Sequence, residues 1–209
     1  MEIIHFPDDE RPARWRSPVL ALGNFDGLHR GHMKIIERVA RVASERALVP
    51  IVLTFDPHPT RIVRPDKAPP LLMTKAQKIE GFARAGMHGV AVVRFTPEIA
   101  HWDPETFVRT VLADWLRVGE VWVGANFLFG HDRTGDLSAL RQLGVRYGFR
   151  TEKIDPVQIA AVRDQISSLQ LDIPGKETTR LSLMLLAGRN LRFSGIPYGG
   201  PVQIDLLER

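Results

Sequence analysis

The chain has 209 residues, of which 44% are hydrophobic and 25% are charged, and its formal net charge is +4. This content suits one α/β domain with a short appendage, and the absence of cysteine excludes disulfides and thiolate metal sites. No apolar run reaches membrane-spanning length and no signal-peptide pattern opens the chain, so we expect a cytoplasmic protein. The basic excess suits small anions as well as nucleic acid, no Lys/Arg block singles out nucleic acid, and an ordinary solvated surface is the better interpretation of most of these charges.

Short apolar runs alternate with amphipathic segments along the chain. In chain order, we expect strands over residues 19–24, 49–54, 89–94, 120–124 and 149–154, and helices over about 33–46, 75–85, 104–116 and 137–147. Thr74 is the expected N-cap of the second helix, and Gly86 and Gly148 are expected to end the second and fourth. The alternation predicts an α/β fold with a Rossmann-like, doubly wound parallel sheet, in which ligands bind beyond the carboxyl ends of the strands.

The run GNFDGLHRGH, residues 23–32, joins the first expected strand to the first expected helix. Its glycines allow positive φ angles or the close approach of a ligand, and the helix start would aim free N–H groups at an anion. His29 and His32 are three residues apart, so both imidazoles can donate to the same phosphate oxygens. A zinc site is the weaker interpretation because the pair lacks an obvious third ligand, although His58 is a candidate.

This run resembles the signature G-x-F-D-G-x-H-x-G-H of the HxGH nucleotidyltransferases. Its form is most similar to the adenylyltransferase module, or FAD synthetase, of the prokaryotic bifunctional riboflavin kinase/FMN adenylyltransferase family. Three later stretches agree in order: TFDPHP at 54–59, LMT at 72–74 followed by Lys75 and Lys78, and VGANFLFG at 123–130 followed by Arg133, Gly135 and Asp136. The resemblance covers roughly residues 18–168.

The resemblance implies that FMN attacks the α-phosphorus of ATP, giving FAD and pyrophosphate, with Mg²⁺ accompanying ATP. His29 and His32 would then be the catalytic residues that stabilise charge on the α-phosphate. The residues implied at ATP are Gly23, Asn24, Phe25, Gly31, Ser167 and Ser168, and those implied at the flavin are Asp56, His58, Asn126 and Arg133. Asp26 either orients a histidine or caps the turn. No protein ligand for a metal is predicted, and the sequence does not indicate an oligomeric state.

The resemblance weakens after the fifth expected strand. Where the family has I-S-S-T-R-I-R, this chain has ISSLQLD at 166–172, so Leu169 replaces a Thr, and Gln170 and Asp172 replace two Arg. Losing the guanidinium groups should weaken the grip on the ATP phosphates. Thr178, Thr179 and Arg180 either replace that grip in a shifted register or form only a helix cap. Leu128 also departs from the family, which has Arg there.

We expect residues 1–187 to form one FMN adenylyltransferase-like domain. Residues 188–209 resemble a truncated start of a riboflavin kinase module, and because no P-T-A-N element is present, kinase activity is not expected. Two functions stay open: an active FMN adenylyltransferase, or a weak or inactive remnant that binds flavin or nucleotide. A third, an HxGH transferase with another phosphorylated acceptor, is disfavoured by the TFDPHP and Asn126 motifs.

Overall fold

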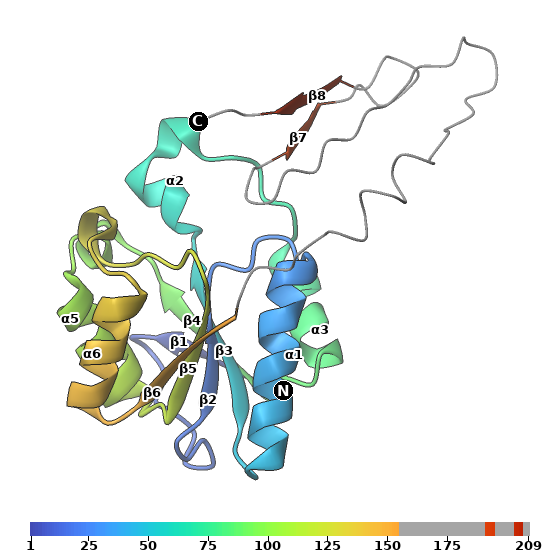
Figure 1. Cartoon of the computed structure of the whole chain (residues 1–209). Coiled ribbons are helices and arrows are strands. Elements are labelled where there is room, and N and C mark those ends of the chain that lie inside the picture. Colours follow the sequence, from blue (N-terminus) through green and yellow to red (C-terminus); the bar gives the residue numbers. More distant parts are fainter. Residues whose placement is uncertain (155–190, 195–202, 207–209) are drawn as a thin grey trace. The chain divides into compact units, whose positions relative to one another are not determined.

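The computed structural model describes residues 1–154, 191–194 and 203–206. The first compact unit, Met1–Pro156, contains six parallel strands in the order β1-β4-β3-β2-β5-β6 (Figure 1). The strands are β1 Glu2–Phe6, β2 Val19–Leu22, β3 Pro50–Asp56, β4 Gly89–Arg94, β5 Glu120–Gly124 and β6 Arg150–Ile154. In the second unit, β7 Leu191–Ser194 and β8 Gln203–Leu206 pair antiparallel. The predicted boundary at 187/188 lies outside the described residues and stays a prediction.

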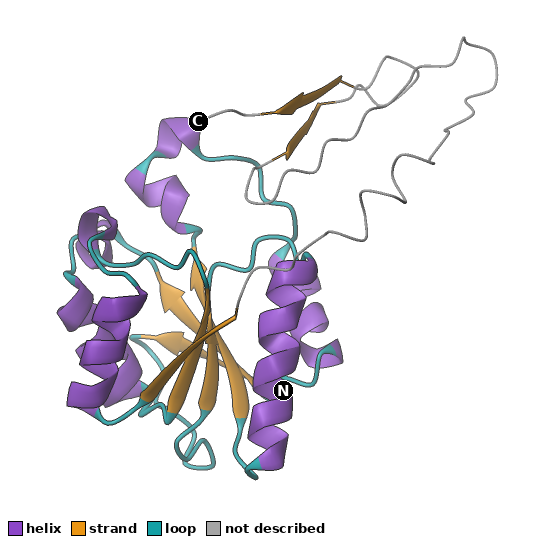
Figure 2. Ribbon diagram, in the orientation of Figure 1, coloured by secondary structure: helices purple, strands orange, loops and turns teal. Residues whose placement is uncertain are grey.

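Helices cover both faces of the sheet (Figure 2). They are α1 Arg30–Glu45, α2 Pro59–Val63, α3 Lys75–Arg84, α4 Pro97–Ala100, α5 Pro104–Phe107, the π-helical segment η2 Val108–Trp115 and α6 Leu137–Tyr147, with 3₁₀ turns η1 Pro65–Lys67 and η3 His131–Arg133. α1 and α3 lie on one face, and α5 and α6 lie on the other (Figure 1). No helix among the described residues is long and apolar enough to cross a membrane.

The strand order places the topological switch beside β2. From β2 the chain adds β3 and then β4 on one side, whereas β5 and β6 extend the sheet on the other. In such a sheet the ligand crevice opens where the order reverses, beyond the carboxyl ends of the strands. The turn after β2 and the loop after β5 therefore border the expected crevice.

The central strands β2 to β5 are buried along most of their length because both faces of the sheet are covered, whereas the edge strands β1 and β6 are mostly partly buried or exposed. In β2, Leu20 and Leu22 pack in a core with η2 and α6 residues, whereas Val19 and Ala21 pack in a second core with residues of α1. All four side chains are buried. This continuous burial confirms the doubly wound, Rossmann-like fold that was expected from the sequence.

The predicted helices and strands are confirmed with local differences. α1 begins at Arg30 rather than at 33, because His29 already caps it. Thr74 caps α3 in a reciprocal capping box with Gln77, and Gly148 ends α6 in the left-handed conformation at φ 81°. The predicted helix over 104–116 is divided into α5 and the π-helical η2. The edge strand β1 was missed.

At the amino end of the sheet, Glu120 is only 2% exposed. Its Oε2 accepts from Arg150 at 2.8 Å and also from Arg46, and its Oε1 accepts from Trp122 Nε1 at 2.7 Å. Because Arg46 follows α1 and Arg150 opens β6, one carboxylate joins three elements. A buried carboxylate is tolerated only with such partners.

Candidate nucleotide and flavin site

The turn after β2, residues 23–29, is folded over one buried ring. Phe25 has a φ of 49° and is completely buried, with its ring edge-on to Phe82 at 5.6 Å between centroids. A Cβ at Gly23 would lie 3.2 Å from the Phe25 ring, and Gly27 has a φ of 72°, a conformation that favours glycine. We call this segment the nucleotide turn. The turn's shape therefore rests on two glycines and one inward phenylalanine.

The two histidines of the turn lie together at the start of α1. Their rings stack with 3.7 Å between centroids and 20° between planes. His29 Nδ1 accepts from the His32 N–H at 3.3 Å, so the His29 proton is on Nε2. A Cβ at Gly31 would lie 3.2 Å from the His29 ring, and glycine therefore leaves room for the imidazole beside the helix start.

The His32 ring is held by the nucleotide turn itself. Its Nδ1 lies 2.7 Å from the Gly27 carbonyl oxygen, which can only accept, so Nδ1 carries the proton. Burial lowers the pKa of His32, although the Gly27 hydrogen bond opposes this shift. The ring is therefore neutral at pH 7 without a ligand. A bound anion would favour protonation of Nε2, which would make it a second donor beside His29.

The segment that leads into α3 packs against the nucleotide turn. The Asn24 carbonyl oxygen accepts from Thr54 Oγ1 at 2.9 Å and from Lys78 Nζ at 3.0 Å. Asp26 Oδ1 accepts from the Leu72 N–H at 3.0 Å. Asp26 thus ties the turn to the chain before α3, and no hydrogen bond from Asp26 to a histidine is described. In the sequence, Lys78 belongs to a motif, but no role in the site is predicted for it.

The TFDPHP turn, residues 54–59, leaves the carboxyl end of β3. Asp56 is exposed at the strand's last position, with Oδ2 3.7 Å from Lys75 Nζ. His58 caps α2, because its Nδ1 accepts from the Thr60 N–H at 3.3 Å. Burial lowers the pKa of His58, and the charge of Asp26 opposes that shift. The two turns are therefore close enough for their charged groups to interact.

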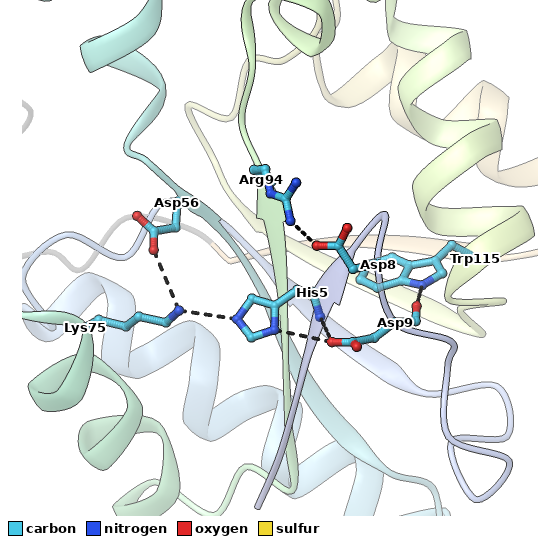
Figure 3. A network of polar contacts seen from close by, with 7 residues as sticks. All are labelled: His5, Asp8, Asp9, Asp56, Lys75, Arg94 and Trp115. Carbon is cyan, nitrogen blue, oxygen red and sulfur yellow. Dashed lines mark hydrogen bonds and ion pairs between the residues drawn. The ribbon is translucent and has the colours of Figure 1, made fainter.

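A polar network that the sequence did not predict surrounds Asp56 (Figure 3). Lys75 Nζ lies 3.3 Å from His5 Nε2, and His5 Nδ1 lies 3.3 Å from Asp9 Oδ2. Arg94, at the end of β4, pairs with Asp8. Because β1 was not predicted, His5 and the two aspartates could not be placed beside this sheet edge from the sequence.

A hollow of about 230 Å³ opens beside this network, lined by His5, Asp56, Pro57, Val92 and Arg94. It lies where β1, β3 and β4 end, since His5, Asp56 and Arg94 belong to the last positions of those strands. An apolar floor of Val92 and Pro57 with charged groups around it can take a small polar ligand.

The loop after β5 carries Asn126 and Arg133, both exposed. Phe129 and Gly135 exchange two backbone hydrogen bonds of 2.9 Å, which close the intervening loop on itself. Asp132 and Arg133 have positive φ angles of 51° and 59°. Among residues 1–154, no ion pair of the exposed Arg133 is described.

The structure brings most of the predicted site residues to one end of the sheet. The nucleotide turn, the TFDPHP turn and the Asn126 loop follow β2, β3 and β5, which are neighbours. Ser167 and Ser168 lie outside the described residues, as do Leu169, Gln170 and the alternative segment 178–180. Their assignment to ATP stays a prediction.

A Rossmann-like sheet with a histidine pair at the helix start of its switch point is the architecture of a nucleotidyltransferase. A protein-family model for FAD synthetase matches residues 11–170. The chain belongs to the FAD synthetase, or FMN adenylyltransferase, family of nucleotidyltransferases.

Curated relatives agree with this family. The bifunctional riboflavin kinase/FMN adenylyltransferase of Escherichia coli K12 is 37% identical over 131 residues, which are 63% of this chain and 42% of the relative. The protein of the same name from Pseudomonas fluorescens is 34% identical over 174 residues, 82% of this chain and 54% of the relative. The chain thus spans about half the length of these relatives.

A solved structure shares the fold. The crystal structure of a macrolide-efflux protein from Streptococcus pneumoniae matches with a TM-score of 0.59 and 19% identity, covering 72% of this chain and 52% of that one. At this identity the likeness concerns the fold alone.

Proposed function

We propose that this protein transfers the adenylyl group of ATP to FMN, giving FAD and pyrophosphate. The observation that carries the proposal is the stacked His29–His32 pair at the N-terminus of α1, on the switch point of the sheet and next to the TFDPHP turn. A helix N-terminus with two imidazole donors suits the α-phosphate of a nucleotide. Family membership, through the match over residues 11–170, supports ATP and FMN as the substrates.

In this proposal the chain mainly positions two anions. Gly23, Asn24, Phe25 and Gly31 would border ATP, and His29 Nε2–H and protonated His32 would donate to the α-phosphate oxygens, whose charge rises in the transition state. Asp56, His58, Asn126 and Arg133 would contact FMN. These are the residues that the resemblance assigned.

Mg²⁺ would arrive with ATP. Among the described residues, no group of three or more His, Asp or Glu side chains is arranged to hold a metal ion. In this proposal the phosphates of ATP are the principal ligands of Mg²⁺, as is common for this ion. The cytoplasmic location stays a prediction.

The direct test is an assay of the purified chain with ATP, Mg²⁺ and FMN, in which FAD is measured by chromatography. FAD and pyrophosphate should form in equal amounts. If FMN and ATP bind but no FAD appears, the chain is a binding remnant. If another phosphorylated acceptor is adenylylated in place of FMN, the acceptor assignment is wrong.

The altered segment 166–172 supplies a second test. If Leu169 and Gln170 occupy the family's Thr and Arg positions, Leu169→Thr with Gln170→Arg should tighten ATP binding by about 1.5 to 3 kcal/mol, the usual range for a charged hydrogen bond. If residues 178–180 have taken over instead, Arg180→Ala should weaken ATP binding and the double substitution should do little. Calorimetry with ATP separates the two registers, and an unchanged affinity in both variants would remove this segment from the phosphate site.

A further inference from the structure

Helix α3 supports the nucleotide turn along one of its faces. Lys78 Nζ donates to the Asn24 carbonyl oxygen at 3.0 Å, and Gly81, close to Lys78 on α3, leaves its Cβ space to the Leu28 side chain. The next residue, Phe82, meets the Phe25 ring. Three successive contacts therefore fix α3 against the turn. The Lys78 ammonium is held at a defined place in the site rather than extended into solvent.

Lys78 lies among charged groups from both turns. Its side chain is half-buried, and burial lowers its pKa, while Asp26 and Asp56 oppose that shift. In return, the Lys78 charge lowers the pKa of His32 and of His58. Charged groups from both turns therefore affect the pKa of Lys78, and Lys78 in turn affects the pKa of one imidazole in each turn.

The TFDPHP turn brings no positive charge of its own to an acceptor phosphate. Asp56 is a carboxylate, and Lys75 beside it is already shared with His5. His58 accepts a hydrogen bond at Nδ1, and burial lowers its pKa, so its ring is neutral at pH 7. A phosphate monoester beside this turn needs a nearby cation. The Asn24 carbonyl oxygen that accepts from Lys78 Nζ at 3.0 Å also accepts from Thr54 Oγ1 at 2.9 Å, so the ammonium lies beside the start of this turn. An ammonium has three N–H donors, and among residues 1–154 a hydrogen bond is described for only one of those of Lys78.

We propose that Lys78 binds the phosphate of the flavin acceptor and holds it against the α-phosphate of ATP. This inference rests on the proposed adenylyltransferase function. An oxygen of the acceptor phosphate forms a bond to the α-phosphorus, the bond from that phosphorus to the oxygen bridging to the β-phosphate breaks, and pyrophosphate leaves with the electron pair. Lys78 keeps its protons throughout and offsets the repulsion between the two anions.

Lys78→Gln removes the positive charge but keeps an N–H donor for the Asn24 carbonyl oxygen. It therefore tests the charge of Lys78 apart from its contact with the turn. FMN and riboflavin, which share a ring but differ in the phosphate, are titrated into the purified full chain. We expect Lys78→Gln to weaken FMN binding about ten- to a hundredfold, as for a lost charged hydrogen bond, and to leave riboflavin binding unchanged. Lys78→Arg should restore part of the FMN affinity. Arg84→Ala, an exposed residue on the last turn of α3 that pairs with Glu80, should change neither.

Several results would overturn the inference. Equal losses for FMN and riboflavin would leave Lys78 a structural role only, and equal affinities of the wild-type chain for the two flavins would remove the phosphate contact. If Lys78→Gln forms FAD with unchanged kcat and KM, Lys78 does not bind the acceptor phosphate, while the proposed function stands. If Lys78→Gln loses affinity for FMN but not for riboflavin, and the wild-type chain makes no FAD, Lys78 binds the flavin phosphate although the proposed function fails. Circular dichroism of each variant checks that the fold is kept.

Discussion

Polar side chains at the two ends of the central strands differ in how many of their hydrogen-bonding atoms already have partners in the protein. At the amino end, Glu120 is buried, and its two oxygens accept from Arg46, Arg150 and Trp122. At the carboxyl end, His29 is exposed, His32 is partly buried, and the hydrogen bonds described for their rings engage only Nδ1.

This difference separates polar groups that hold the fold from polar groups that can act on a ligand. A buried carboxylate with all its partners satisfied fixes neighbouring elements and has nothing left to offer a substrate. A ring that is oriented through one nitrogen still presents the other nitrogen to a ligand. Stability and chemistry should therefore respond to different substitutions at the two ends.

The largest expected effect is on catalysis at the carboxyl end. His29→Ala or His32→Ala should each slow FAD formation by about a hundredfold or more, because each removes a donor to the charge that develops on the α-phosphate. The fold should be kept at a cost of only about 1 kcal/mol in the free energy of unfolding, because His29 caps α1 and His32 bonds to the Gly27 carbonyl oxygen. Steady-state kinetics together with urea unfolding measure both quantities. Near-wild-type turnover in either variant would remove that histidine from the mechanism.

At the amino end, the expected effect is on stability instead. Glu120→Gln should lower the free energy of unfolding by about 1.5 to 3 kcal/mol, because a neutral amide cannot satisfy two guanidinium groups. Glu45→Gln is the matched control, since Glu45 is exposed and lies 4.0 Å from Arg41, and it should cost less than about 0.5 kcal/mol. Urea unfolding compares the two variants. Turnover per folded molecule should stay unchanged, and a large loss of turnover in Glu120→Gln would contradict the division between the two ends.

The central strands, the helix caps and the histidine pair could be predicted from the sequence, because short-range patterns determine them. Buried parallel strands need continuous apolar runs, and the Gly-rich turn, the Thr74 cap and Gly148 act within a few residues, so local pattern alone places them. The two histidines share one turn of helix, and their spacing fixes their proximity.

Contacts between distant segments could not be predicted in this way. β1 joins the sheet through β4, about ninety residues later along the chain, and without that pairing the sequence offers no link between His5, Asp56 and Arg94. The same holds for Glu120, whose partner Arg46 lies 74 residues earlier in the chain. Lys78 belongs to a recognised motif, but its contact with Asn24 depends on how α3 packs.

The smallest expected effect is a pH dependence of stability at the carboxyl end. Burial lowers the pKa of His32 and of His58 below 6.5 in the folded chain, so between the folded pKa and 6.5 the unfolded chain binds more protons. The ligand-free chain should therefore be most stable above about pH 6.5 and lose stability as the pH falls below that value toward the folded pKa of each histidine. His32→Gln and His58→Gln should each flatten this dependence, as measured by urea unfolding across that range. ATP should oppose it, because a bound anion favours protonated His32, and tighter ATP binding at higher pH would show that His32 does not carry the proton in the complex.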